Sequence, residues 1–207
     1  VPTRSDLTLR TFIKELNNQE VSSREPNVQT VDGELKYLHT KEPVNVEEDD
    51  LITYVVRVYN EGGKATKVNE ITTYLPEGLE FVQTDRTNVR NAWKVSEDGR
   101  KIVSDGLADT EISAYEGSGV PDYAELEMVV RVVLHTELEE IRLVNISEIT
   151  SATEKDENAN FGSITNGVDN TYKYDEAITS TAESYIKGQE DDDDFENVSL
   201  ASDLVVS

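Results

Sequence analysis

The 207-residue chain contains no cysteine, which excludes a disulfide framework, a zinc ribbon and a thiol nucleophile. It has only two histidines, His39 and His135, and they lack the H-x-x-x-H and H-E-x-x-H spacings. A histidine-rich metalloenzyme site is therefore nearly excluded. No apolar run approaches the roughly 20 residues of a transmembrane helix, and no signal peptide or wall-sorting tail is visible. We expect a part of a longer protein that does not insert into a membrane.

Positive charge is also scarce, with 19 Lys and Arg residues against 43 Asp and Glu and a formal net charge of -24. A surface this negative repels nucleic acid and anionic membranes, whereas cations and basic partners remain possible. Because 36% of the residues are hydrophobic, the chain can bury a core of ordinary size. These values predict one large or two small globular domains.

Short blocks of alternating apolar and polar residues, separated by turn residues, predict an all-β fold, an Ig-like antiparallel β-sandwich. Asp98-Gly99 is a strong signal for a two-residue hairpin between two of these blocks. The expected strands are 6–13, 51–60, 67–75, 79–83, 92–95, 100–104, 124–134, 141–150 and 195–200.

The remaining segments are expected to be mostly loops. Segments 17–35 and 151–173 are rich in polar residues and Gly, and the acidic run 190–194 is interpreted as a solvated linker or loop. One short helix is possible at 174–188, with Asp175 as N-cap and Gly188 as the C-terminal stop.

We therefore expect a single repeat domain over residues 1–200. Its core is 6–150 together with a last strand at about 195–200, and 151–194 is a loop insertion between them. The stretch SDLVVS at 202–207 begins like SDLTLR at 5–10. This similarity suggests that 201–207 is a linker or the start of the next repeat.

Several motifs in order resemble the DUF11-type repeat domains of Gram-positive cell-surface proteins, relatives of the Cna-type pilin and adhesin modules. They are VNVEEDDLITYVVRVYNEGGKATKVNEITTYLPEGLEFV (44–82), then AWKV, AELEMVVRVVL and RLVNISEIT. The resemblance covers about 6–150, and GQEDDDDFENV (188–198) is similar to the acidic step into the last strand of that family. It implies an Ig-like sandwich strung in tandem in a stalk or adhesin, outside the cell.

The resemblance also implies a possible spontaneous amide bond between a strand Lys and a strand Asn, assisted by a buried Asp or Glu. Burial lowers the pKa of the amine and raises that of the acid, so packing creates the reactive site. Asn145 occupies the position of the family's electrophile. The positions of the usual Lys and Asp are occupied here by Thr11 and Thr73.

Two interpretations of Asn145 follow. In the first, Asn145 is cross-linked to Lys14 with the help of Glu70 or Glu80, which requires a bulge because strand alternation puts Lys14 on the opposite face from Thr11. In the second, which we prefer, Thr11, Thr73 and Asn145 form a neutral buried hydrogen-bonded cluster. Such a cluster satisfies polar groups that would otherwise cost roughly 1–3 kcal/mol each.

Acidic loops provide a second type of candidate site. KDENAN (155–160) and EDDDD (190–194) contain oxygen ligands of the kind that Ca²⁺ takes, although they do not fit the EF-hand pattern. No other cofactor is indicated. The candidate calcium ligands are Asp156, Asn158, Asp191 and Asp193.

The expected function is non-catalytic: a structural stalk or adhesin repeat of a cell-wall-anchored surface protein, with adjacent repeats as partners. The alternative is a ligand-binding adhesin domain, in which loops 17–35 and 105–123 with Tyr115 and Tyr123 contact a host or matrix molecule. A third possibility, an acidic-site hydrolase, has only the chance pairing of carboxylates in its favour.

Overall fold

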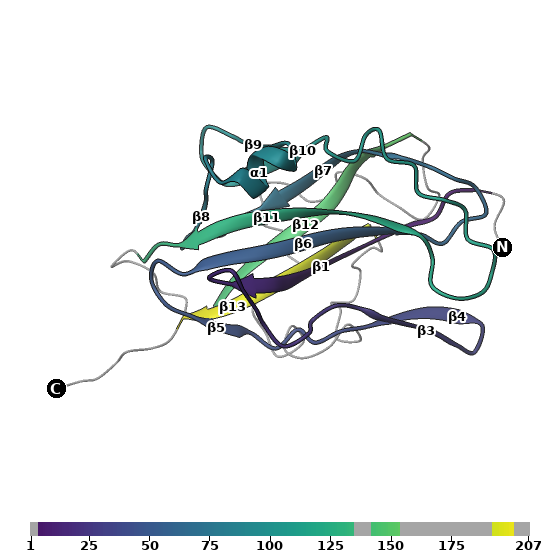
Figure 1. The fold of residues 1–207 in the computed structure, drawn as a ribbon, viewed down its shortest axis with the longest axis horizontal. Coiled ribbons are helices and arrows are strands. Elements are labelled where there is room, and N and C mark those ends of the chain that lie inside the picture. The colour runs from purple at the N-terminus through teal and green to yellow at the C-terminus, as the bar shows by residue number, and fades with distance from the viewer. Residues whose placement is uncertain (1–3, 135–141, 154–191, 201–207) are drawn as a thin grey trace.

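The computed structural model describes residues 4–134, 142–153 and 192–200 of the chain, which form a β-sandwich of two facing sheets (Figure 1). The order in the first sheet is β2 (Gln19–Glu20), β1 (Leu7–Leu16), β6 (Leu51–Asn60), β11 (Tyr123–Val132) and β8 (Leu79–Phe81). The order in the second is β5 (Val44–Val46), β13 (Asp193–Leu200), β12 (Arg142–Ala152), β7 (Val68–Tyr74), β10 (Lys101–Ser104) and β9 (Trp93–Val95). The predicted all-β sandwich is confirmed.

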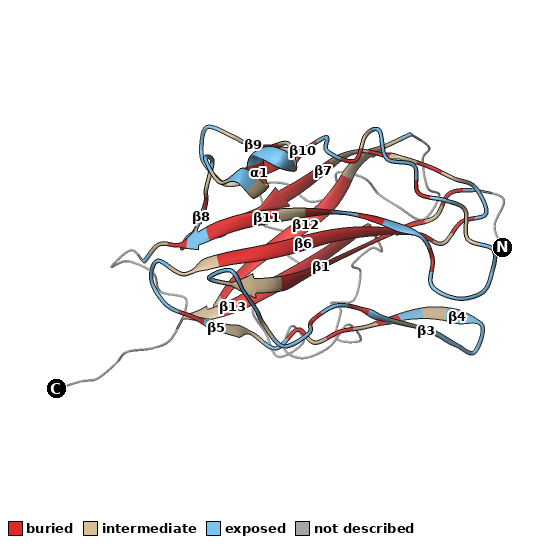
Figure 2. Ribbon diagram, in the orientation of Figure 1, coloured by how far each residue is buried: buried red, intermediate tan, exposed pale blue. Residues whose placement is uncertain are grey.

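Strand alternation accounts for the core between the sheets. In β6, residues Ile52, Tyr54, Val56 and Val58 recur at every second position and are all fully buried. Their counterparts on the second sheet include Ile71 and the other inward residues of β7 and β12. Figure 2 shows that the long central strands of both sheets are almost entirely buried. At about 25 cal/mol per Å² of apolar surface, this burial is the main stabilising contribution to the fold.

Each of the nine predicted strands has a counterpart whose ends lie within three residues of the prediction. The predicted hairpin between β9 and β10 is present, but its loop is longer than the two residues expected. The Ser96 N–H donates to the Lys101 carbonyl at 2.8 Å across the base of the loop, and Gly99 has a positive φ of +74°. All strand pairs are antiparallel except β13 with β5, which run parallel. In the described part of the chain, no helix has the length and apolar character needed to cross a membrane.

The prediction that 17–35 is a long loop was wrong in part. This region contains β2 and the hairpin of β3 (Asn27–Val31) and β4 (Glu34–Leu38), which forms a separate two-stranded sheet beside the sandwich (Figure 1). A short helix, α1 (Arg86–Arg90), was also not predicted; Asp85 caps it by accepting the Thr87 N–H at 2.8 Å. The possible helix at 174–188 lies outside the described residues.

The acidic run 190–194 is not a solvated linker where the structure describes it. Asp192 and Asp194 are fully buried and Asp193 is 3% exposed, and the last two begin β13. A carboxylate is normally too costly to bury, and the charge partners that compensate for this cost at Asp194 form the candidate site.

Candidate functional site: a buried ionic clamp between the first and last strands

The site begins at an unpaired edge of β1. Along residues 7–14, β1 pairs with β6 on one side only, since its other neighbour, β2, pairs only with Glu15 and Leu16. Backbone groups on the open side are buried and would each cost free energy if they were left unsatisfied. At Thr11 and Ile13, side chains from other elements, rather than another strand, bond these groups.

Two carboxylates of β13 accept the open N–H groups. The Thr11 N–H donates to Asp194 Oδ2 and the Ile13 N–H donates to Glu196 Oε2, both at 2.9 Å. Asp194 and Glu196 lie two residues apart, so strand alternation directs both side chains toward β1. The last strand is therefore bonded to the first across the sandwich.

Two cations neutralise these carboxylates. The guanidinium of Arg24, from the β2–β3 connection, holds Glu196 in a two-pronged pair, with Nε–Oε2 at 2.9 Å and Nη2–Oε1 at 2.6 Å. The ammonium of Lys41, from the β4–β5 connection, lies 3.0 Å from Asp194 Oδ2. We call Arg24, Lys41, Asp194 and Glu196 the ionic clamp.

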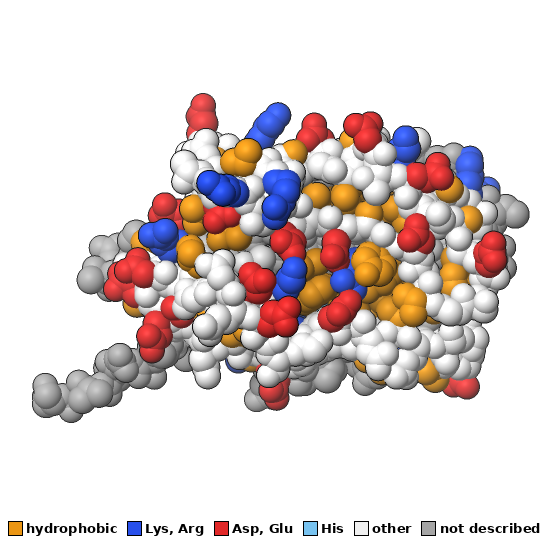
Figure 3. Space-filling model, viewed as in Figure 1, with side chains coloured by type: hydrophobic (Ala, Val, Ile, Leu, Met, Phe, Trp, Pro, Cys, Tyr) orange, Lys and Arg blue, Asp and Glu red, His pale blue; other side chains and the backbone are white. Residues whose placement is uncertain are grey.

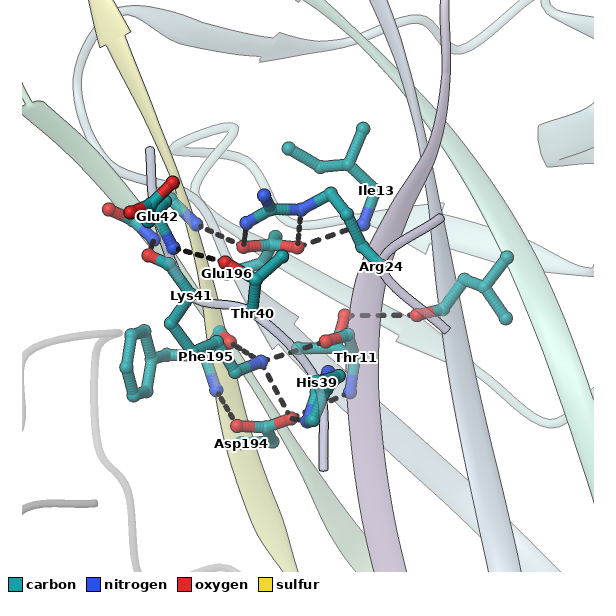
Figure 4. Close-up of polar contacts among 12 residues, drawn as sticks. Thr11, Ile13, Arg24, His39, Thr40, Lys41, Glu42, Asp194, Phe195 and Glu196 are labelled. Carbon is teal, nitrogen blue, oxygen red and sulfur yellow. Dashed lines mark hydrogen bonds and ion pairs between the residues drawn. The ribbon is translucent and has the colours of Figure 1, made fainter. Parts of the chain in front are cut away.

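Lys41 occupies the centre of the clamp, between β13 and β1 (Figure 4). Besides Asp194, its ammonium donates to the Thr11 carbonyl at 2.9 Å and to the Phe195 carbonyl at 2.5 Å. The Asn197 amide donates to the Lys41 carbonyl at 2.7 Å and so fixes the segment that carries the lysine. All three donor positions of the ammonium are therefore used, as a buried Lys requires.

The clamp is dry. The side chains of Lys41, Asp194 and Glu196 are fully buried, and that of Arg24 is 7% exposed. Burial lowers the pKa of Lys41 from its usual value, and Asp194 and Glu196 oppose this shift. Burial, together with the charges of Lys41 and other nearby cations, also holds the pKa of His39 well below its usual value. Its Nε2 lies 3.8 Å from Asp194 Oδ2, and the ring is neutral at pH 7.

The two hydrogen bonds from β1 to β13 show how these strands run relative to each other. Thr11 is bonded to Asp194 and Ile13 to Glu196, so residue numbers rise together and β1 runs parallel to β13. In Figure 1 the arrowheads of both strands point the same way. The start of β1 and the end of β13 therefore lie at opposite ends of the clamp.

The preferred prediction of a hydrogen-bonded cluster of Thr11, Thr73 and Asn145 is not what the structure shows. All three residues are fully buried, as expected. However, the Thr11 hydroxyl donates to the Val55 carbonyl at 3.0 Å, and the Thr73 hydroxyl pairs with Ser147 at 2.8 Å. Each threonine hydroxyl is thus hydrogen-bonded within its own sheet. Neither the side-chain nitrogen nor the side-chain oxygen of Asn145 has a hydrogen-bond partner within the described part of the chain.

The structure also does not place Lys14, Glu70 and Glu80, the residues of the alternative cross-link, next to Asn145. The bulge that the cross-link required is present between Ile13 and Glu15, but the Lys14 ammonium lies 2.5 Å from Glu127, and its side chain is 41% exposed. Glu70 accepts the Thr150 hydroxyl at 2.6 Å, and Glu80 is exposed on β8. The structure therefore does not bring Lys14 to Asn145.

Of the four predicted calcium ligands, Asp156, Asn158 and Asp191 lie outside the described residues. Asp193 is buried in β13. Within the described ranges, no group of three or more His, Asp or Glu side chains is placed to hold a metal ion. Calcium binding stays a prediction.

The predicted ligand-binding loops do meet. Tyr115 lies between two hollows, one of about 540 Å³ that the β3–β4 hairpin also lines, and one of about 430 Å³ that Tyr123 lines. Segments 17–35 and 105–123 thus border a common surface, formed in part by a hairpin rather than by a loop.

Comparison with known proteins gives no family assignment: no family model matches the chain, and no curated protein matches it. The DUF11-type resemblance therefore stays a prediction.

Among solved structures, similar folds include the pilus backbone RrgB from Streptococcus pneumoniae, with 12% identity and a TM-score of 0.39. The match covers 70% of this chain and 52% of that one, so the chain spans about half the length of the pilus protein. A cohesin–dockerin complex from Clostridium thermocellum, Coh-OlpC-Doc435, matches with 11% identity and a TM-score of 0.32, over 56% of this chain and 79% of that one.

Proposed function

We propose that this protein is a non-catalytic structural module of a Gram-positive cell-surface protein, acting as a stalk or adhesin repeat that holds binding regions away from the cell wall. Its partners are adjacent repeats of the same polypeptide, and it works outside the cell. The sequence resemblance over 6–150 supports this class of protein. The observation that carries the proposal is the ionic clamp between β1 and β13.

The clamp suits a chain that is pulled from its two ends. Force that enters before Leu7 and leaves after Leu200 acts at opposite ends of two parallel strands. Such force shears the strands, so the links at Thr11 and Ile13 resist it together rather than one after another. Each link is a charge-assisted hydrogen bond, which is roughly twice as strong as a neutral one.

A stalk module without cysteine needs another way to join its first and last strands, and the clamp provides one. It is non-covalent, yet removal of one partner leaves a buried charge uncompensated, a change that costs about 3–5 kcal/mol. Shear of β1 against β13 must break the hydrogen bonds from Thr11 and Ile13 to these carboxylates at the same time. We therefore expect the clamp to contribute much of the mechanical resistance.

Single-molecule pulling from the two ends of the chain tests the proposal. The variant Asp194→Asn/Glu196→Gln keeps acceptors for both β1 amides but removes both charges. It should unfold at clearly lower force than the natural protein, whereas the control Glu97→Gln/Asp109→Asn, which removes two exposed charges, should not change the force. Equal forces for all three proteins would contradict a mechanical role for the clamp.

A second function is favoured by one observation, the common surface that Tyr115 shares with the β3–β4 hairpin. A repeat that also binds a ligand at this surface would act as an adhesin domain and not only as a spacer.

A further inference from the structure

Two neighbouring hollows are both lined by Tyr115, and we call the two together the tyrosine groove. One part lies between the β3–β4 hairpin, at Gly33 to Leu35, and the loop at Tyr115 and Gly117. The other lies between Tyr115 and Tyr123. The first hollow has a volume of about 540 Å³ and the second about 430 Å³, which is enough for several amino-acid side chains.

Tyr123 presents exposed ring surface on a firm support. Tyr123 is 42% exposed, yet its ring is backed by the Arg57 guanidinium, 4.1 Å from the ring centroid, and by Tyr59 at 5.4 Å between centroids. Arg57 is in turn held by Glu125 and Glu25, each at 2.7 Å. On the face turned toward the viewer, Figure 3 shows hydrophobic side chains beside a few basic and several acidic ones. An aromatic surface held in this way binds a partner with little loss of side-chain entropy.

The charge of the groove is of one sign. Its lining includes five carboxylates and, among the described residues, no Lys or Arg; the carboxylates are Asp6, Glu34, Glu61, Glu116 and Asp122. Asp122 accepts the Ser113 N–H at 2.7 Å, and Glu61 accepts the Thr8 hydroxyl, so part of this charge is anchored in the fold. Glu34 and Glu116 are exposed. Clefts lined by one sign of charge attract ligands of the opposite sign.

The backbone beside the groove favours a peptide over a glycan. Among the described strands, β3 and β4 pair only with each other, so their outer edges carry backbone groups that a further extended chain can bond. An extended peptide that adds to such an edge gains main-chain hydrogen bonds and points alternate side chains the same way. A glycan can bond single groups of this edge through its hydroxyls, but it lacks the regularly spaced N–H and C=O groups that continue a strand ladder.

From these observations we propose that the tyrosine groove binds an extended basic peptide segment of a partner protein, whose Lys or Arg side chains lie against the tyrosines and carboxylates. A cation over the face of a Tyr ring is attracted by the ring, and the carboxylates neutralise its charge. This interaction is additional to the mechanical role proposed above, and its failure would leave the pulling experiment unaffected.

Fluorescence anisotropy with the whole protein tests the proposal. The probe is a labelled decapeptide of alternating Lys and Thr; the comparisons are the same peptide with Glu for Lys and a labelled neutral hexasaccharide of N-acetylglucosamine. We expect saturable one-to-one binding of the Lys peptide alone, weakening with added salt because the pairs at the groove rim are screened. Preferential binding of the saccharide or of the Glu peptide, or no binding at all, would overturn the proposal.

Variants locate the binding. Glu34→Gln/Glu116→Gln should weaken the Lys peptide about five- to tenfold, as expected for the loss of two exposed ion pairs, and Tyr115→Ala should weaken it independently. The control Glu97→Gln/Asp109→Asn removes the same charge from exposed positions outside the groove. An equal loss of affinity in the control would show that the Lys peptide is attracted by the overall negative charge of the protein. That result would contradict a specific binding site at the tyrosine groove. Unchanged melting temperatures confirm that each variant is folded.

Discussion

The pair of Arg24 and Glu196 gives the sharpest quantitative prediction. Glu196→Gln removes the charge that compensates a guanidinium only 7% exposed, while its amide oxygen can still accept the Ile13 N–H. Breaking a buried pair in this way costs about 3–5 kcal/mol, because one charge stays buried without its partner. Since small domains are stable by only about 5–15 kcal/mol, the loss should be easily measured.

A double-mutant cycle separates the pair from its surroundings. Arg24→Met removes the unpaired charge from the Gln variant and restores apolar packing, so the double variant should lose only about 1–2 kcal/mol relative to the natural protein. Arg24→Met alone leaves Glu196 buried without its cation and should also cost about 3–5 kcal/mol, so the coupling energy should be at least about 4 kcal/mol in magnitude. The matched control is Lys14→Met/Glu127→Gln, a pair with side chains 41% and 25% exposed, which should change stability by less than about 1 kcal/mol.

The assay is urea unfolding followed by the fluorescence of Trp93, the only tryptophan, which is 6% exposed and accordingly sensitive to unfolding. A cost of less than about 1 kcal/mol for Glu196→Gln, or a double variant as unstable as the single one, would show that Glu196 does not compensate the charge of Arg24.

Three further predictions concern other parts of the molecule. Gly62→Ala should destabilise the fold by about 2 kcal/mol or more in urea unfolding, because the added Cβ would lie 2.0 Å from the Arg4 carbonyl oxygen; a neutral effect would show that the N-terminal segment does not pack there. His39 is buried neutral with a lowered pKa, so the unfolded state binds more protons below about pH 6.5 and stability should fall by up to about 1.4 kcal/mol per pH unit as the pH drops. His39→Asn should remove that part of the slope, and an unchanged pH profile would contradict the burial of a neutral ring. The intact mass should equal that of the sequence, because Lys14 is paired with Glu127; a mass lower by about 17 Da, the loss of ammonia, would reveal a Lys–Asn amide bond.

The sandwich was predictable because apolar residues recur with period two over long strands. In β6, the ten predicted residues 51–60 are the ten observed ones. The hairpin β3–β4 was missed because its strands are short and largely exposed and β3 carries polar residues on both faces, so the periodicity is weak.

The clamp was missed for a different reason. Asp194 and Glu196 occupy the inward face of a strand, where the pattern calls for apolar residues, and their partners Arg24 and Lys41 come from connections more than 150 residues away in sequence. A signal was present, since Asp194, Glu196 and Val198 alternate in one strand and Val198 belongs to the core. Without knowledge of which cations face them, the acidic residues looked like part of a solvated run.

The most direct test of the central claim, that the clamp resists shear between β1 and β13, compares two directions of pulling on the same protein. Because the chain has no cysteine, attachment points can be introduced singly. Cysteines at Asp6 and Leu200 load opposite ends of the clamp and shear it, whereas cysteines at Asn17 and Leu200 load the same end and peel it apart. We expect a clearly higher unfolding force for the first pair, whereas equal forces in the two directions would show that the clamp does not resist shear.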